Sequence, residues 1–287
     1  MKICRFNDNR LGVARDDRIY DVTDALDVLP ALRYPAPTYD VLIANLDTVR
    51  TRIEALLPAA TSVPVDSVTF LSPVANPGKI VAAPVNYTKH LEEARADAEI
   101  HHQNAIQEIQ RIGLFLKATS SLVGVSAGVD LEHPNRRNDH EAEVVAVIGK
   151  QGRNISAADA LSYVAGYSIG LDMTTRGPEE RSMRKSIDTY SVVGPWLVTS
   201  DELSDPSALD FELTVNGEPR QKANTRDLIL GIPEIIEYAS SFYTLHPGDI
   251  IFTGTPEGVG PVVGGDTIHV TMQGIGSISV AVRSPKA

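Results

Sequence analysis

The sequence predicts an α+β fold in which strands predominate, and three observations support this. Beyond residue 140 strand-like segments dominate, and only 157–161 and 232–243 interrupt them with a helical pattern. Strands and helices therefore do not alternate, which excludes a doubly wound sheet. Near the start, residues 2–6, 10–14 and 18–22 are also strand-like and are separated by turn-prone residues. The later predicted strands are 144–148, 164–171, 196–199, 211–215, 249–252, 267–272 and 278–282.

The remaining elements divide the chain into two parts. Residues 39–57 have apolar side chains at near-helical spacing, and four prolines follow between residues 58 and 77. We therefore expect a boundary near residue 70, between a small N-terminal β module (residues 1–70) and a large C-terminal domain (residues 71–287). Residues 79–83 predict a short strand. Residues 88–112 predict the longest helix, which Thr88 caps at its N-terminus.

The composition excludes several classes of partner. The chain has 287 residues, a net charge of −11 and a pI of about 5.1, so nucleic acid and anionic membrane surfaces are unfavourable partners. An anionic substrate would need a local positive feature, such as a metal ion or a lysine. The single cysteine fits a reducing cytoplasm. Neither a signal peptide nor a membrane span is expected, because no apolar run is long enough.

Two glutamates precede a strand that is expected to be buried on both faces. Residues 144–148 (VVAVI) are continuously apolar, and Glu141 and Glu143 come directly before them. Alternation along a strand places both side chains on one face, with Cα atoms roughly 6.6 Å apart. The two charges repel, so that one carboxyl group should protonate unless a cation lies between them. The alternative is a frayed strand end with both side chains in water.

A third acid strengthens the case for a metal site. Residues 164–171 predict a second buried strand, which ends in Asp172. Three carboxylates suit Mg²⁺ or Mn²⁺ and leave about three of six octahedral positions for water and substrate. By itself, Asp172 could equally cap a turn.

These segments together resemble the fumarylacetoacetate hydrolase family. The family pattern joins an acidic strand, a G-Y-x-x-x-x-D strand, a K-S-x-D segment, an N-G-E turn and a T-G-T-P loop. The corresponding segments occur here in that order, preceded by N-Y-x-x-H-x-x-E at 86–93 and F-x-K at 115–117. The five segments of the family pattern lie, in the order given above, at residues 139–143, 166–172, 185–188, 216–218 and 253–256. The resemblance runs from about residue 79 to 283.

The resemblance implies a mostly β, α+β domain with a mixed, rolled sheet or barrel, usually in a homodimer. It also implies that Glu141, Glu143 and Asp172 hold the metal. It places Lys117, Asp188 and the loop Thr253-Gly254-Thr255 at the substrate. A glycine-containing turn can offer backbone N–H groups to a carboxylate, although an ordinary strand-ending turn has the same sequence.

His90, Glu93 and Lys185 are the expected catalytic residues. His90 and Glu93 share a helix face, and a carboxylate can orient an imidazole that acts as a base; the family is thought to use the pair in this way. A surface pair is the alternative. Lys185 lies in the most cationic segment and could stabilise an enolate, unless the segment is a solvated loop. Arg181 and Arg184, in the same segment, are expected at the rim.

Two departures from the family pattern concern the substrate. Residues 94–114 form a proline-free helical stretch where relatives have a short proline-bearing loop, and residues 177–184 replace a glutamine-bearing segment. Both changes put the usual substrate contacts in doubt, but not the metal site.

The leading hypothesis is a divalent-metal-dependent hydrolase that cleaves a carbon–carbon bond in an acylpyruvate-like 2,4-dioxo acid. The metal would chelate the 2-oxo acid end, and His90 would activate the attacking water. Two alternatives remain open. One is a lyase or isomerase acting on oxaloacetate or a sugar-derived 2-keto acid, and the other is a binding protein without catalysis.

Overall fold

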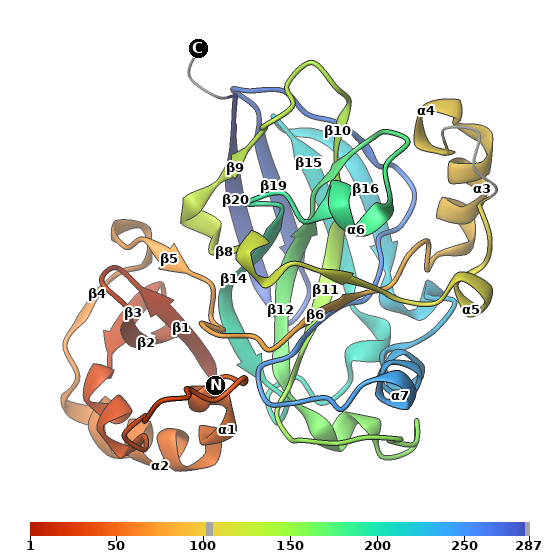
Figure 1. Ribbon diagram of the computed structural model, residues 1–287. Helices are drawn as coiled ribbons and strands as arrows, with labels where there is room; N and C mark the ends of the chain where they lie inside the picture. Colours follow the sequence, from red (N-terminus) through yellow and green to blue (C-terminus); the bar gives the residue numbers. More distant parts are fainter. Residues whose placement is uncertain (102–105, 285–287) are drawn as a thin grey trace.

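The computed structural model describes residues 1–101 and 106–284, and most of the regular structure is β-strand (Figure 1). One large sheet has twelve strands: β1 (Lys2–Phe6), β2 (Arg10–Arg15), β3 (Arg18–Asp21), β4 (Ser62–Pro64), β5 (Phe70–Leu71), β6 (Ile80–Ala82), β7 (Phe115–Lys117), β8 (Leu122–Val123), β11 (Ala142–Ile148), β12 (Val164–Asp172), β14 (Ser191–Thr199) and β17 (Ile250–Phe252). Their order is β4-β3-β2-β1-β14-β12-β11-β17-β6-β7, with β5 beside β1 and β8 beside β14.

Two smaller sheets complete the strand content. One contains β10 (Asn138–His140), β13 (Thr174–Thr175) and β18 (Gly260–Pro261). The other contains β9 (Val129–Asp130), β15 (Asp210–Val215), β16 (Glu218–Asn224), β19 (Thr267–Met272) and β20 (Gly276–Arg283). Most neighbours are antiparallel, but β6–β17, β8–β14 and β9–β20 are parallel. The mostly β, α+β class with mixed sheets is thus confirmed. The expected barrel is wrong, because the pairings of the described strands leave each sheet open.

The helices are α1 (Val41–Ala44), α2 (Leu46–Leu56), α3 (Thr88–Ala96), α4 (Ala98–His101), α5 (Ile109–Ile112), α6 (Arg181–Lys185) and α7 (Ile232–Phe242). In α7 the buried residues Ile232, Ile235, Ile236 and Ala239 follow helical spacing, as the sequence predicted. The segment expected as one helix at 39–57 is two helices that meet at Asn45. Residues 157–161 form a turn leading into a 3₁₀ helix at Ala160–Tyr163.

The long helix expected at 88–112 is wrong, because Asp97 interrupts it. The backbone of Asp97 is extended (φ −94°, ψ 108°), and its side chain accepts a hydrogen bond from Glu99 N at 2.8 Å. Such local bonding by aspartate competes with helix continuation. An ion pair with Arg137 at 2.9 Å holds Asp97 further. The result is the series α3, α4 and α5 along one edge of the molecule (Figure 1), with 102–105 outside the described residues.

The centre of the large sheet is a pair of fully buried antiparallel strands. Every residue of β11 and of β12 is buried, and the register pairs Ala142 with Leu171 and Glu143 with Gly170. Residue 170 has to be glycine, since a Cβ there would lie 2.5 Å from a methyl group of Val145. This rigid pair carries the acidic residues at one end. In the described residues, no helix combines the length and apolarity that crossing a bilayer requires.

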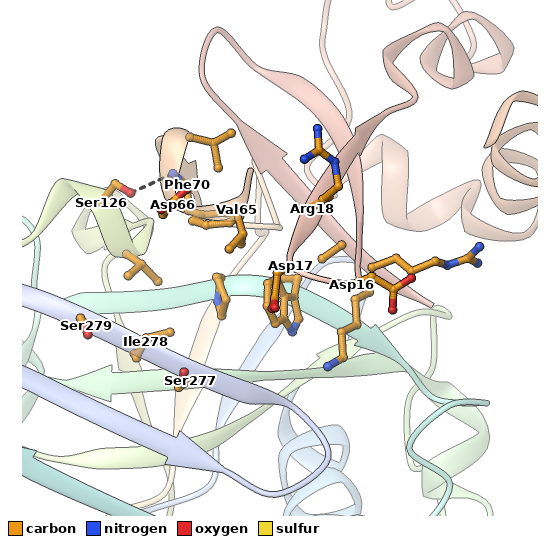
Figure 2. A pocket seen from close by; sticks show the side chains of 17 residues that line it. Asp16, Asp17, Arg18, Val65, Asp66, Phe70, Ser126, Ser277, Ile278 and Ser279 are labelled. Carbon is orange, nitrogen blue, oxygen red and sulfur yellow. Dashed lines mark hydrogen bonds between the residues drawn. The ribbon is translucent and has the colours of Figure 1, made fainter. Parts of the chain in front are cut away.

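The N-terminal strands join the same sheet through β1, which pairs with β14 (Ile3 opposite Leu197). A cleft of ≈ 700 Å³ lies between these strands, β14 and β20 (Figure 2). Trp196 lines it in edge contact with Phe70, whose backbone N–H donates to Ser126 Oγ at 2.8 Å. The cleft contains none of the expected site residues. The boundary near residue 70 stays a prediction.

The hydrogen bonds of Asp249 are expected to hold β17 beside β6, and a substitution at this residue tests this. This fully buried carboxylate accepts hydrogen bonds from Lys79 N at 3.0 Å, Lys79 Nζ at 2.5 Å and His246 N at 2.7 Å. We expect Asp249→Ala to lower the free energy of unfolding by about 3 kcal/mol, because it leaves buried donors without partners. Urea unfolding measures this. The exposed Glu54→Ala should change it by less than about 0.5 kcal/mol, and an equal loss in both variants would contradict the account.

Candidate metal centre and active site

The three predicted acids meet at one end of the β11–β12 pair. Glu141 lies between β10 and β11, Glu143 is the second residue of β11, and Asp172 ends β12. The backbone N–H of Asp172 donates to the carbonyl oxygen of Glu141 at 2.9 Å, which sets the two acids opposite each other. One carboxylate oxygen from each of the three residues lies within 4.8 Å of the others, and all three side chains are buried. The structure therefore brings the three predicted residues together, and their role as metal ligands stays a prediction.

Buried cations neutralise part of this charge. Lys185 on α6 donates to Glu141 Oε2 at 2.6 Å and to Asp172 Oδ2 at 2.8 Å. Lys117 on β7 is fully buried; it contacts Asp172 Oδ1 and donates to the carbonyl oxygen of Tyr190 at 2.8 Å. Lys117 thus contacts an acid of the centre, and its expected role at the substrate stays a prediction.

The cations compensate Glu141 more than Glu143, and the pKa values of these two carboxyl groups shift in opposite directions. Burial would raise the pKa of Glu141, but Lys185, Arg176 and His90 outweigh it and lower the pKa to about 2. Burial and the neighbouring Asp172 charge raise the pKa of Glu143 well above its usual value. The nearest compensation for Glu143 is the backbone N–H of Gly254, which donates to Oε2 at 2.6 Å. Glu143 is thus the carboxyl group that most needs either a proton or a further cation.

His90 and Glu93 form the expected pair on α3. His90 Nδ1 lies 2.8 Å from Glu93 Oε2, and His90 is only 4% exposed. The other oxygen, Glu93 Oε1, accepts a hydrogen bond from Gly258 N at 2.9 Å, which ties α3 to the loop after β17. Gly258 has a φ of +88°, and a Cβ there would lie 2.1 Å from the carbonyl oxygen of Arg220. The surface alternative is therefore wrong for His90.

The loop at 253–255 contacts the acidic strand directly. The hydroxyl of Thr253 donates to Val144 O at 2.8 Å and that of Thr255 to Ala142 O at 3.0 Å, while Gly254 N–H points to Glu143. These bonds fix the loop against β11. Thr255 also lines the cavity, whereas Asp188 is exposed in the loop before β14. Contact of these residues with substrate stays a prediction.

A small cavity of ≈ 50 Å³ opens beside Glu141. Pockets for small ligands usually have about 300–1,000 Å³, so part of the wall has to move when an oxo acid enters. The wall consists of apolar residues from α3, α4 and their surroundings, the catalytic candidates and a group of cations. The lining residues are Ala83, Pro84, Val85, His90, Ala94, Ile100, Ile106, Phe115, Glu141, Arg176, Arg181, Arg184, Lys185 and Thr255.

Sequence reasoning did not assign Arg176 to the site. This buried guanidinium donates to Asp139 Oδ2 at 2.8 Å and to Glu141 Oε1 at 3.0 Å. Thr174 also donates to Glu141 Oε1, at 3.1 Å. Residues 172, 174 and 176 alternate along an extended segment, so their side chains reach the same side. That spacing was the signal available in the sequence. Arg181 and Arg184, expected at the rim, line the cavity instead.

The acidic triad fits a hard divalent cation. Mg²⁺ and Mn²⁺ prefer carboxylate oxygens, and these three residues bring such oxygens close enough to share one ion. Lys117 and Lys185 occupy some of the same oxygens, so an ion would have to displace an ammonium group or share an oxygen with it.

Comparison with known proteins agrees with this geometry. The sequence pattern described as "Fumarylacetoacetate (FAA) hydrolase C-terminal" matches residues 79–283, and the chain belongs to this family. Maleylpyruvate hydrolase from Aquipseudomonas alcaligenes is 58% identical over 286 residues, covering 99% of this chain and 100% of that protein.

Solved structures and more distant relatives extend the comparison. The crystal structure of maleylpyruvate hydrolase from Sphingobium sp. SYK-6 in complex with manganese(II) and pyruvate is 42% identical, with a TM-score of 0.84 and full coverage of both chains. Oxaloacetate tautomerase Fahd2a from Rattus norvegicus is 36% identical over 220 residues, which is 75% of this chain and 66% of that protein.

The raised pKa of Glu143 predicts pH-dependent metal binding. A proton bound to Glu143 must leave before this carboxylate can bind an ion, so the affinity for Mn²⁺ should rise as the pH rises toward the raised pKa of Glu143. Over that range we expect a gain of up to about tenfold per pH unit. Calorimetry in buffers of different ionisation enthalpy measures both the affinity and the proton released. Glu143→Gln should bind more weakly and lose the pH dependence, whereas an affinity independent of pH in the unmodified protein would contradict the assignment.

Proposed function

We propose that this protein is a divalent-metal-dependent hydrolase that cleaves the carbon–carbon bond of an acylpyruvate. The observation that carries the proposal is the convergence of Glu141, Glu143 and Asp172, with His90 lining the same cavity as Glu141. The maleylpyruvate hydrolase that is 58% identical across the whole chain supports maleylpyruvate as the substrate. The Sphingobium structure with manganese(II) and pyruvate supports Mn²⁺ as a suitable ion, and Mg²⁺ satisfies the same oxygen ligands.

The protein's own groups account for the water-dependent step. In the tautomer that we propose, Nδ1–H of His90 donates a hydrogen bond to Glu93, which leaves Nε2 unprotonated and free to take a proton from a water molecule. The hydroxide formed attacks the carbonyl carbon of the acyl group, and the bond to the neighbouring CH₂ carbon breaks. The products are a carboxylic acid and the enolate of pyruvate. The enolate carbon then takes up the proton that His90 removed from the water molecule, which gives pyruvate.

The cationic side of the cavity would stabilise the departing enolate. Lys185 lies where the negative charge develops, with its ammonium group already held between Glu141 and Asp172. A bound Mg²⁺ or Mn²⁺ would supply Lewis-acid polarisation of the 2-oxo acid end. Arg176 fixes the orientation of Glu141, and Gly254 N–H fixes that of Glu143.

Action on oxaloacetate is a second candidate, favoured by the relatives named oxaloacetate tautomerase. Tautomerisation requires a proton to move between carbon and oxygen, without an attacking water and without C–C cleavage. The same cavity could hold oxaloacetate, and His90 could carry the proton. The two candidates differ in product, because only the hydrolase releases pyruvate from a 2,4-dioxo acid. A homodimer and a cytoplasmic location stay predictions.

The role of His90 can be measured as pyruvate released from maleylpyruvate by the Mn²⁺-loaded protein. We expect His90→Ala to lower kcat by about 10²- to 10⁴-fold, because the base that activates water is removed. Mn²⁺ affinity should persist in this variant. The exposed His133→Ala is the matched control and should change kcat by less than about twofold.

Three further results test the metal dependence, the choice between the two candidates and the assigned base. EDTA should abolish pyruvate release, and added Mn²⁺ should restore it. Turnover of the enol form of oxaloacetate, with no pyruvate from any 2,4-dioxo acid, would contradict the hydrolase and favour the tautomerase. An unchanged kcat in His90→Ala would contradict the assigned base.

A further inference from the structure

Four cations line the cavity beside the acidic triad, and two of them, Arg181 and Arg184, have no acidic partner among the described residues. Arg176 and Lys185 are engaged with the acids of the centre. Arg184 donates to the carbonyl oxygens of Glu179 at 2.8 Å and Thr175 at 3.1 Å. In the part of the chain that the structure describes, no carboxylate oxygen lies within 4.0 Å of an Arg181 nitrogen. This guanidinium is the cavity cation available to an anionic ligand.

Arg181 lies about one helical turn before Lys185, the residue of α6 that contacts the acidic centre. It is the first residue of α6, and Lys185 is the last, so both side chains share a face of the helix. The Arg181 guanidinium carbon lies 5.5 Å from the ring centre of Phe115, and Lys185 Nζ lies 5.7 Å from the same centre. Both cations thus lie near the Phe115 ring. Lys185 forms ion pairs with Glu141 and Asp172, whereas Arg181 forms no ion pair among the described residues.

The surroundings make an anion favourable at this position. Burial lowers the pKa of Arg181; the charges of Glu180, Glu141 and Asp172 oppose this shift, and the positive charge of Arg176 adds to it. Burial and the charges of Arg176 and Arg181 also lower the pKa of Arg184. A desolvated cluster of like charges is costly until an anion joins it. The same cavity is also lined by Ala94, Ile100 and Ile106, which belong to one apolar cluster and could pack against a carbon chain.

We propose that Arg181 binds a second carboxylate of the substrate, at the end of the acyl group remote from the 2-oxo acid. Arg181 then selects acylpyruvates whose acyl group ends in a carboxylate over those that end in a methyl group. The planar guanidinium suits two parallel hydrogen bonds to one carboxylate. This assignment rests on the proposed function for the orientation of the substrate, with its 2-oxo acid end at the triad. The maleyl group, which carries a terminal carboxylate, is an acyl group of the required kind.

A comparison of two substrates tests the selectivity. Maleylpyruvate and acetylpyruvate share the 2-oxo acid end, but only maleylpyruvate carries the remote carboxylate. In Arg181→Gln we expect kcat/KM for maleylpyruvate to fall by about 10- to 100-fold, mainly through KM, because a charge-assisted hydrogen bond is lost. The value for acetylpyruvate should fall by a much smaller factor. Arg181→Lys, which keeps the charge, should recover part of the selectivity.

The matched control is Arg153→Gln, which removes one positive charge from an exposed position in the loop after β11. It should leave both kcat/KM values within about twofold of those of the unmodified protein. Equal losses for both substrates in Arg181→Gln would overturn the selective role, and no loss for maleylpyruvate would overturn binding.

A binding measurement separates this proposal from the proposed function. Calorimetry with the Mn²⁺-loaded protein would compare maleate with (Z)-2-butenoate, in which a methyl group replaces one carboxylate. We expect Arg181→Gln to weaken maleate binding by about 10-fold or more and to affect the monoacid much less. This result would support the anion site even if the protein cleaved no 2,4-dioxo acid. A failure to cleave any 2,4-dioxo acid would refute only the proposed hydrolase activity. Equal maleate affinity in both proteins would overturn the role of Arg181, whatever the enzyme activity.

Discussion

Mutual repulsion among three buried carboxylates is the constraint on which this site depends. Glu141, Glu143 and Asp172 meet at the end of two fully buried strands, where charge without compensation is unfavourable. Lys117 and Lys185 contact two of these acids, and a backbone N–H is directed at the third. The same oxygens suit a divalent ion. The site therefore has an arrangement of oxygens suited to a metal ion, in which two ammonium groups and a backbone N–H offset part of the acidic charge.

The fold divides the work between rigid and peripheral parts. The central strands of the large sheet fix the acids through a continuous register, and the loop at 253–255 is hydrogen-bonded onto β11. His90 comes from α3, a short helix near one edge of the molecule, which Glu93 anchors to Gly258 N. His90, the proposed base, is therefore tied to the same loop region that orients Glu143. The proposed substrate selection belongs to α6, whose last residue contacts the acids and whose first residue also lines the cavity.

The sequence predicted those features that depend on local periodicity. Alternation placed Glu141 and Glu143 on one face, and the apolar run after them is β11, buried throughout. The i, i+3 spacing of His90 and Glu93 predicted their contact. Strand β16 was missed because its sequence EPRQKAN is polar, although the Asn216-Gly217 turn that joins it to β15 was a local signal for a hairpin. The break at Asp97 was missed because its ion pair with Arg137 joins residues far apart in the sequence.

The cations of the cavity show the same limit. The spacing of residues 172, 174 and 176 could have indicated Arg176, but Arg181 and Arg184 enter the cavity only because α6 packs beside β7 and Phe115. No local pattern separates a lining arginine from one at the rim.

Anomalous X-ray scattering from crystals soaked in Mn²⁺ tests the central claim most directly. The account predicts one strong peak within bonding distance of Glu141, Glu143 and Asp172, with the Lys185 ammonium moved away from the shared oxygens. A peak elsewhere, or an acidic centre without manganese at saturating concentration, would contradict it.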